Sequence, residues 1–224
     1  MWEWRLFFPK EQTITLEDIN DLSVTLAKTP QEVRSDLYFN LSHQEFGLKE
    51  RDFSEQKKHG KFLELKILLD KKSWGAESWK KCLKLPLKME LTKTQLLGLL
   101  KQEELNSPYT SQLASVRQII EQNAGNKILV HKKRKQTSAI YSLDSSTWSF
   151  SSKKYYFAKR GQKSLWFEET QLTINNHSWT SIAIEGKDLN ILNLFMVSFL
   201  SKYSGAVMGY PEFLAKVSSK KSLF

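Results

Sequence analysis

The strongest constraint on this chain is a repeated alternation of apolar and polar residues. A period of two is the signature of a β-strand with one buried face. Residues 62–69 show it most clearly, because Leu and Ile alternate there with Glu64 and Lys66. Residues 2–8 alternate in the same way, with Glu3 and Arg5 on the face opposite the tryptophans. A chain built on such segments has to form a sheet.

The coarse pattern along the chain predicts strands, helices, strands and helices again. Further strands are expected at 34–40, 48–53, 127–135, 165–174 and 179–185, and the Ser-rich stretch 142–154 can hold a turn and another strand. Thr92 followed by Gln95 forms a capping-box pattern at the start of a helix, and a second helix is expected over 110–123. Apolar segments at 189–200 and 210–217 predict two more. The fold class is therefore α+β, built mainly on antiparallel sheet.

Charged residues occur in pairs on one face of several predicted strands, since residues two apart on a strand point the same way. The pairs are Glu3/Arg5, Lys49/Arg51, Glu64/Lys66 and Lys132/Arg134. One interpretation is that each pair lies on a solvated sheet face. The other is that about eight strands close into a barrel, with these charges lining its interior. The helices at 92–123 and 189–217 would then cover the outside, although the helix over Tyr210–Leu214 could instead plug one mouth of the tunnel.

The chain has 224 residues and a net charge of +10, which favours an acidic partner without choosing one. We expect one domain over 1–217 and a basic, flexible tail over 218–224. No apolar stretch reaches the length of a membrane span. The single cysteine, Cys82, gives no disulfide, and no secretory signal pattern is present, so we expect a cytoplasmic protein. A core role for Cys82 is favoured over catalysis.

Short motifs along nearly the whole chain resemble the CYTH superfamily, also called triphosphate tunnel metalloenzymes. Glu3-Trp4-Arg5 resembles the end of its Glu-x-Glu-x-Lys signature, and Val130-His131-Lys132-Lys133-Arg134 is similar to its V-x-K-x-R strand. The other similar segments, in the family's order, are 36–40, 48–51, 63–66, 182–186 and 209–214. The resemblance implies an eight-stranded antiparallel tunnel with helices packed outside it.

The resemblance also implies which residues bind ligands. The phosphate-binding side chains would be Arg5, Lys49, Arg51, Lys66, Lys132 and Arg134. The metal ligands, for Mg²⁺ or Mn²⁺, would be Glu3 and Glu185, with Glu169 as a third candidate. The ligand would be a triphosphate or a polyphosphate, and the implied activity is hydrolysis of inorganic tripolyphosphate or an organic triphosphate.

Three departures from the family pattern weaken the enzymatic half of this prediction. Met1, Ser181 and Ala183 stand where the family has glutamates. Hard divalent cations need several oxygen ligands, so fewer carboxylates predict weaker metal binding and slower catalysis unless Glu64 or Glu169 compensates. The alternative function is a noncatalytic polyphosphate or phosphate-anion binding protein on the same scaffold.

A third hypothesis is RNA binding. Residues 132–135 form a basic run, and Tyr155, Tyr156 and Phe157 lie among further cations. Aromatic side chains between cations are typical of surfaces that bind single strands. A solvated basic loop beside core aromatics explains the same residues, so nucleic acid is the less favoured partner.

Overall fold

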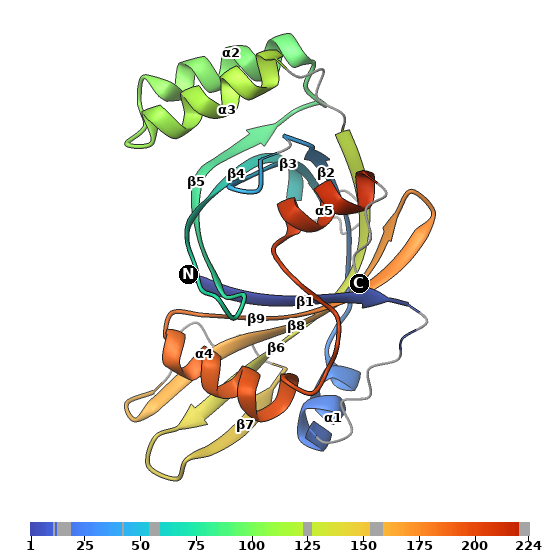
Figure 1. Ribbon diagram of the computed structural model, residues 1–224, viewed down its shortest axis with the longest axis vertical. Helices are drawn as coiled ribbons and strands as arrows, with labels where there is room; N and C mark the ends of the chain where they lie inside the picture. The colour runs from blue at the N-terminus through green and yellow to red at the C-terminus, as the bar shows by residue number, and fades with distance from the viewer. Residues whose placement is uncertain are drawn as a thin grey trace.

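The computed structural model describes residues 1–10, 12, 19–41, 43–53, 59–122, 127–152 and 159–219. Its core is a ring of antiparallel strands in the order β1-β5-β4-β3-β2-β6-β8-β9, closed by pairing of β9 with β1 (Figure 1). The ring strands are β1 (Trp2–Pro9), β2 (Glu32–Phe39), β3 (Phe46–Phe53), β4 (His59–Lys71), β5 (Glu77–Leu87), β6 (Lys127–Ser142), β8 (Gln162–Ile174) and β9 (His177–Gly186). The predicted α+β fold with an eight-stranded antiparallel tunnel is confirmed.

The ring is least complete between β1 and β5. Only Trp2 and Glu3 of β1 pair with β5, at Ser78 and Glu77. Beyond them, β1 pairs instead with the two-residue strand β10 (Ala206–Val207). The short strand β7 (Thr147–Ser151) pairs with the far end of β6, outside the ring order. The ring is therefore open between β1 and β5 beyond Glu3. There, β10 and Met208 form backbone hydrogen bonds with the edge of β1 that β5 leaves free.

Two helical layers cover the outside of the ring (Figure 1). The hairpin of α2 (Lys93–Glu104) and α3 (Thr110–Gln122) packs on the outward apolar residues of β3, β4 and β5, including Leu63 and Leu65. α1 (Asn20–Lys28), α4 (Leu189–Phe195) and the π-helical segment η3 (Met196–Leu200) pack on the outward residues of β1, β8 and β9. The predicted alternation in β1 is confirmed, because Trp4 and Leu6 lie in this outer core. Among the described residues, no helix is long and apolar enough to cross a membrane.

The sequence left two positions open for the last helix, α5 (Tyr210–Ser218): packing on an outer face, or closing one tunnel mouth. The structure shows the second. Phe213 stacks on Phe7, with ring centroids 3.8 Å apart, and Tyr210 stacks on Tyr38 at 5.7 Å. Phe7 and Tyr38 belong to the inward faces of β1 and β2. α5 therefore closes one mouth of the ring, as Figure 1 shows. The physical reason is the open side between β1 and β5, through which the chain enters after β10.

The sequence pattern found most elements and missed three: α1, β5 and the two-residue strand β10. The Thr92 capping box is present, and both its side-chain bonds form. β5 was not predicted, because its run of lysines hides the alternation, and α1 was not predicted either. The expected tail 218–224 lies mostly outside the described residues, since only Ser218 and Ser219 are described.

Replacing Phe213 by alanine tests the docking of α5. Phe213 is fully buried, so Phe213→Ala should lower the free energy of unfolding by about 3 kcal/mol or more, measured by urea denaturation. The control is Leu105→Ala, because Leu105 is 85% exposed and its truncation should change stability little. Equal effects of the two substitutions would contradict the docking.

Candidate functional site

The six predicted phosphate-binding cations all lie on inward faces of the ring. Direct cross-strand partners share a face of a sheet. Lys132 faces Arg34, and Arg51 faces Asp36, in the registers of β2 with β6 and β3. Contacts among inward side chains place the other predicted cations in the same interior: Lys49, Lys66, Arg134 and Arg5. Their phosphate-binding role stays a prediction.

One carboxylate organises most of these cations. Asp36, on β2, is completely buried. Its Oδ2 accepts from the Nζ of Lys132 at 2.9 Å and of Lys49 at 3.1 Å. Its Oδ1 lies 3.3 Å from the Nε of Arg51 and 3.5 Å from the Nε of Arg34. Four cations thus share one carboxylate. Because Arg34 also pairs with Glu32 at 2.7 Å and Arg51 with Glu64 at 3.2 Å, the four cations exceed these three carboxylates by one charge.

Burial and the repulsion between neighbouring cations change the pKa values of these groups. Burial, with the nearby Arg34 and Arg51 guanidiniums, lowers the pKa of Lys132 to about 7 although Asp36 opposes the shift. Burial and Arg51 also lower the pKa of Lys49 well below its usual value. Burial alone would raise the pKa of Asp36, but the surrounding cations hold it well below the ordinary range. The two lysines are therefore only partly compensated.

Glu64 lies beside this group on β4 and is almost fully buried. Its Oε2 forms an ion pair with the Nη1 of Arg51 at 3.2 Å, and its Oε1 forms one with the Nζ of Lys81 at 3.0 Å. Although burial opposes it, Arg51 leads the cations that hold the pKa of Glu64 at about 2. Glu64 is thus an ionised partner of Arg51, and its carboxylate is already engaged by cations.

Carboxylates prevail at the opposite side of the interior, on β1, β8 and β9. Arg5 donates from Nε to Glu3 at 2.8 Å and from Nη1 to Glu168 at 2.9 Å. Its Nη2 lies 3.9 Å from Glu185. Glu168 also receives Arg134 at 3.0 Å. The interior is therefore polarised, with lysines and arginines in excess around Asp36 and glutamates in excess around Arg5.

Glu168, and not the predicted Glu169, belongs to this carboxylate group. Glu169 pairs with Lys135 and Ile182, whereas Glu168 pairs with Gln136, two residues from Arg134 on the same face. Glu169 thus points to the outer face of β8, where burial raises its pKa. The alternation of the strand was predicted, but its register, which decides the face, could not be read from one sequence.

The residues present do not fit a divalent metal site as they stand. Among the described residues, no three His, Cys, Asp or Glu side chains are grouped so that they could hold a metal ion. Glu3 and Glu185 are direct partners across β1 and β9, as a shared metal would require. However, the guanidinium of Arg5 engages Glu3 and Glu168 directly, so their oxygen atoms already have a cation.

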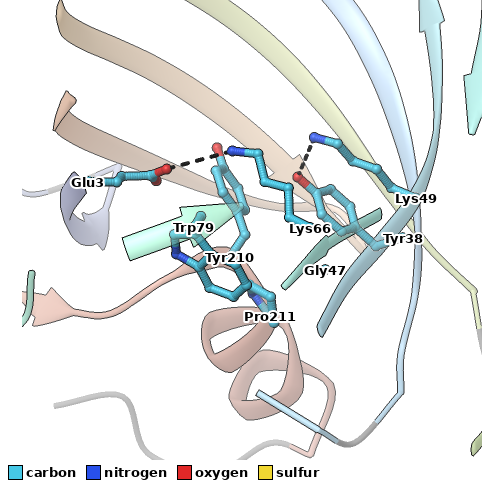
Figure 2. Close-up of a pocket in the computed structure, with 8 residues that line it drawn as sticks. All are labelled: Glu3, Tyr38, Gly47, Lys49, Lys66, Trp79, Tyr210 and Pro211. Atoms are coloured by element: carbon cyan, nitrogen blue, oxygen red, sulfur yellow. Dashed lines mark hydrogen bonds and ion pairs between the residues drawn. The ribbon is translucent and has the colours of Figure 1, made fainter. Parts of the chain in front are cut away.

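A small cavity separates the strands from α5. Its volume is about 50 Å³, and Lys49, Lys66 and Tyr38 reach toward it from the strands (Figure 2). Tyr210 closes it from α5. The Tyr210 ring lies 3.7 Å from the Nζ of Lys132 and 4.6 Å from the Cζ of Arg5, so it covers both cations. Burial raises the pKa of Tyr210 to about 12, which keeps its hydroxyl neutral.

Sequence reasoning missed Arg34, Asp36, Tyr38, Glu168 and Tyr210. The first three lie two apart on β2, so the alternation already placed them on one face. Asp36 does not stand out in the sequence, because the paired charges on the other predicted strands are mostly cationic. The inward position of Glu168 depends on the register of β8, and the position of Tyr210 depends on the path of the chain into α5. A local sequence pattern determines neither.

The residues behind the RNA-binding hypothesis and the single cysteine do not form a second site in the part of the chain that the structure describes. The basic run 132–135 does not form one surface, because Lys132 is buried in the interior and Lys133 is exposed on the opposite face. Tyr155, Tyr156 and Phe157 lie outside the described residues. Cys82 is half-buried, its Sγ donates to the Leu65 carbonyl, and burial raises its pKa to about 11. A thiol with a raised pKa is a poor nucleophile at neutral pH.

No protein-family model matches the chain, and no curated protein matches it. Two solved structures are similar over most of their length. One, from Bacillus halodurans, is described as a "putative adenylate cyclase"; it is 15% identical, with 89% of this chain and 87% of that chain covered and a TM-score of 0.43. The other is the PH1819 protein from Pyrococcus horikoshii OT3, 10% identical, with 98% and 99% covered and a TM-score of 0.46. At this distance, the chemistry of the tunnel has to be read from its own residues.

Lys132 predicts a specific pH dependence of stability. Its pKa of about 7 in the folded protein lies below 10.5, so between these values the unfolded chain binds more protons. Stability contributed through Lys132 therefore rises with pH above about 7. The free energy of unfolding of the wild type minus that of Lys132→Met should increase from pH 7 to pH 10. The control is Lys133→Met, the exposed neighbour; the same slope in both variants would contradict the assignment.

Proposed function

We propose that the protein binds a phosphate-type polyanion, such as tripolyphosphate, in the cation-rich half of the tunnel. The observation that carries this proposal is the sharing of Asp36 by Lys49, Lys132, Arg51 and Arg34. Arg34 also pairs with Glu32 and Arg51 with Glu64, but these two carboxylates and Asp36 carry one charge fewer than the four cations, and Lys49 and Lys132 both rely on Asp36. An added anion therefore gains electrostatic stabilisation there. Phosphate oxygens suit this site, because arginine and lysine donate charge-assisted hydrogen bonds to them.

The binding would be coupled to protons and to the position of α5. An anion beside Lys132 raises the pKa of that lysine from about 7, so binding takes up a proton near neutral pH. The cavity of about 50 Å³ is smaller than the roughly 300 Å³ of a typical small-molecule pocket. A triphosphate would therefore fit in this cavity only if Tyr210 left its place over Lys132.

Hydrolysis of a triphosphate with Mg²⁺ or Mn²⁺ is the second candidate function. The register pairing of Glu3 with Glu185 favours it. The direct ion pairs from Arg5 to one oxygen of Glu3 and one of Glu168 oppose it, since a metal would have to compete with the guanidinium for these carboxylates. Binding without turnover is therefore the function that this arrangement supports best.

Calorimetric titration with tripolyphosphate tests the binding proposal. Wild-type protein should bind, and the affinity should weaken from pH 6 to pH 8.5 as Lys132 loses its proton in the free protein. Arg51→Met and Lys49→Met should each weaken binding by about tenfold or more, because each removes a charge-assisted donor. The matched control is Lys133→Met, which removes an equal charge from the outer face of the sheet.

Phosphate release measured in the same samples separates the two functions. Binding without release above the level of a Lys66→Ala, Arg134→Ala double variant, with Mg²⁺ or Mn²⁺ present, supports the noncatalytic function. Release that depends on the metal and is lost in the double variant would establish the hydrolase instead. No binding by any folded sample would refute both.

Substitution of Tyr210 tests the role of α5 in admitting the anion. Tyr210→Ala uncovers Lys132 and widens the cavity, so tripolyphosphate affinity should rise severalfold while stability falls by about 3 kcal/mol. Tyr210→Phe keeps the ring and should leave affinity and stability close to the wild type. Weaker binding by a folded Tyr210→Ala variant would show that the ring belongs to the binding site.

A further inference from the structure

We propose that Arg5 takes the place of a divalent cation among the tunnel carboxylates, so that the tunnel binds its anion without a metal. The first part concerns only the side chains around Arg5. The second part rests on the proposed function, because it says how the polyanion binds.

The contacts of Arg5 are those expected of a resident cation. Glu3, Glu168 and Glu185 approach one guanidinium from three different strands, at 2.8, 2.9 and 3.9 Å. The guanidinium is buried, with 4% of Arg5 exposed, and remains charged under all ordinary conditions. Its Nη1 also donates to the Oγ of Ser181 at 3.1 Å. Nε and Nη1 therefore donate to acceptors, while Nη2 faces the Glu185 carboxylate at a distance longer than a hydrogen bond.

The neighbours of Arg5 are shaped to hold a planar group. Ala183 is the direct partner of Arg5 across β1 and β9, and it is fully buried. A longer side chain at Ala183 would project into the space beside the guanidinium. The Tyr210 ring lies 4.6 Å from the Cζ of Arg5, in the range of a cation–π contact. The small residues Ser181 and Ala183 thus have a common physical role, because they make room for this cation.

The same contacts remove Arg5 from the anion-binding set. Its Nε and Nη1 donate to carboxylates, and the aromatic ring of Tyr210 covers one face of the guanidinium. The donors left for a phosphate chain lie in the other half of the tunnel, around Asp36. A divalent ion would have to displace a guanidinium from carboxylates that pair with it at close range. Arg5 thereby makes the carboxylates structural partners of a fixed charge.

Mn²⁺ binding, followed by electron paramagnetic resonance and thermal unfolding without any phosphate, tests the first part. Wild-type protein should show no saturable Mn²⁺ site tighter than about 1 mM. Arg5→Gln removes the guanidinium and leaves Glu3, Glu168 and Glu185 facing one another. This variant should bind one Mn²⁺ at least about tenfold more tightly than the wild type, and Mn²⁺ should raise its unfolding temperature.

The matched control is Arg134→Gln. It also removes an arginine partner of Glu168, but Arg134 pairs on its other side with Glu32 rather than with Glu3 and Glu185. It should gain no Mn²⁺ site. A folded Arg5→Gln variant with no gain in Mn²⁺ affinity would overturn the proposal. So would a tight Mn²⁺ site in the wild type that Glu185→Gln abolishes, a result that needs no Arg5 variant to fold. Recovery of an unfolded Arg5→Gln protein by Mn²⁺ would support it.

Tripolyphosphate binding by the wild type in EDTA tests the second part. The affinity should be unchanged between EDTA and a chelator-free buffer to which no metal is added. Binding that disappears in EDTA and returns with Mg²⁺ would overturn metal independence. Absence of binding under both conditions would refute the proposed polyanion function, while the Mn²⁺ comparison would still decide the role of Arg5.

Discussion

The rest of the tunnel depends on the sharing of one buried carboxylate, Asp36, by four cations. Lys132 and Lys49 reach its Oδ2, while Arg51 and Arg34 approach its Oδ1. A buried ion group of this kind costs desolvation energy that is recovered only when the hydrogen bonds are well formed. β2, β3 and β6 are therefore held in register by charge as well as by backbone bonding. The excess of cations in this group is the basis on which we propose that it binds an anion.

A second, opposite group balances the first across the ring. Around Arg5 the carboxylates outnumber the cations, and Glu168 links this group to Arg134 on β6. A closed ring of cations alone would repel itself, but here most of the compensation is internal. Tyr210 on α5 lies against both groups, because its ring contacts Lys132 and Arg5. α5 is thus in direct contact with both charged groups.

The local pattern of the sequence was sufficient for the ring and for most inward cations. Alternation placed Lys49 with Arg51 and Lys132 with Arg134 on one face, because the side-chain period of a strand is fixed. The alternation did not predict which side chains point into the ring where this depends on strand pairing and register. Glu169 was chosen instead of Glu168 for that reason, since a shift by one residue exchanges the two faces. The docking of α5 inside the mouth also depends on the incomplete β1–β5 pairing, which only the three-dimensional structure shows.

The central claim is that a polyanion binds between the cations around Asp36 while Arg5 keeps its carboxylate partners. A crystal structure of the protein grown with tripolyphosphate and EDTA tests this most directly. We expect phosphate oxygens in contact with Lys49, Arg51 and Lys132, with Tyr210 displaced and the Arg5–Glu168 pair intact. Phosphate bound to Arg5 in place of its carboxylates, or bound only on the outer face of the ring, would contradict it.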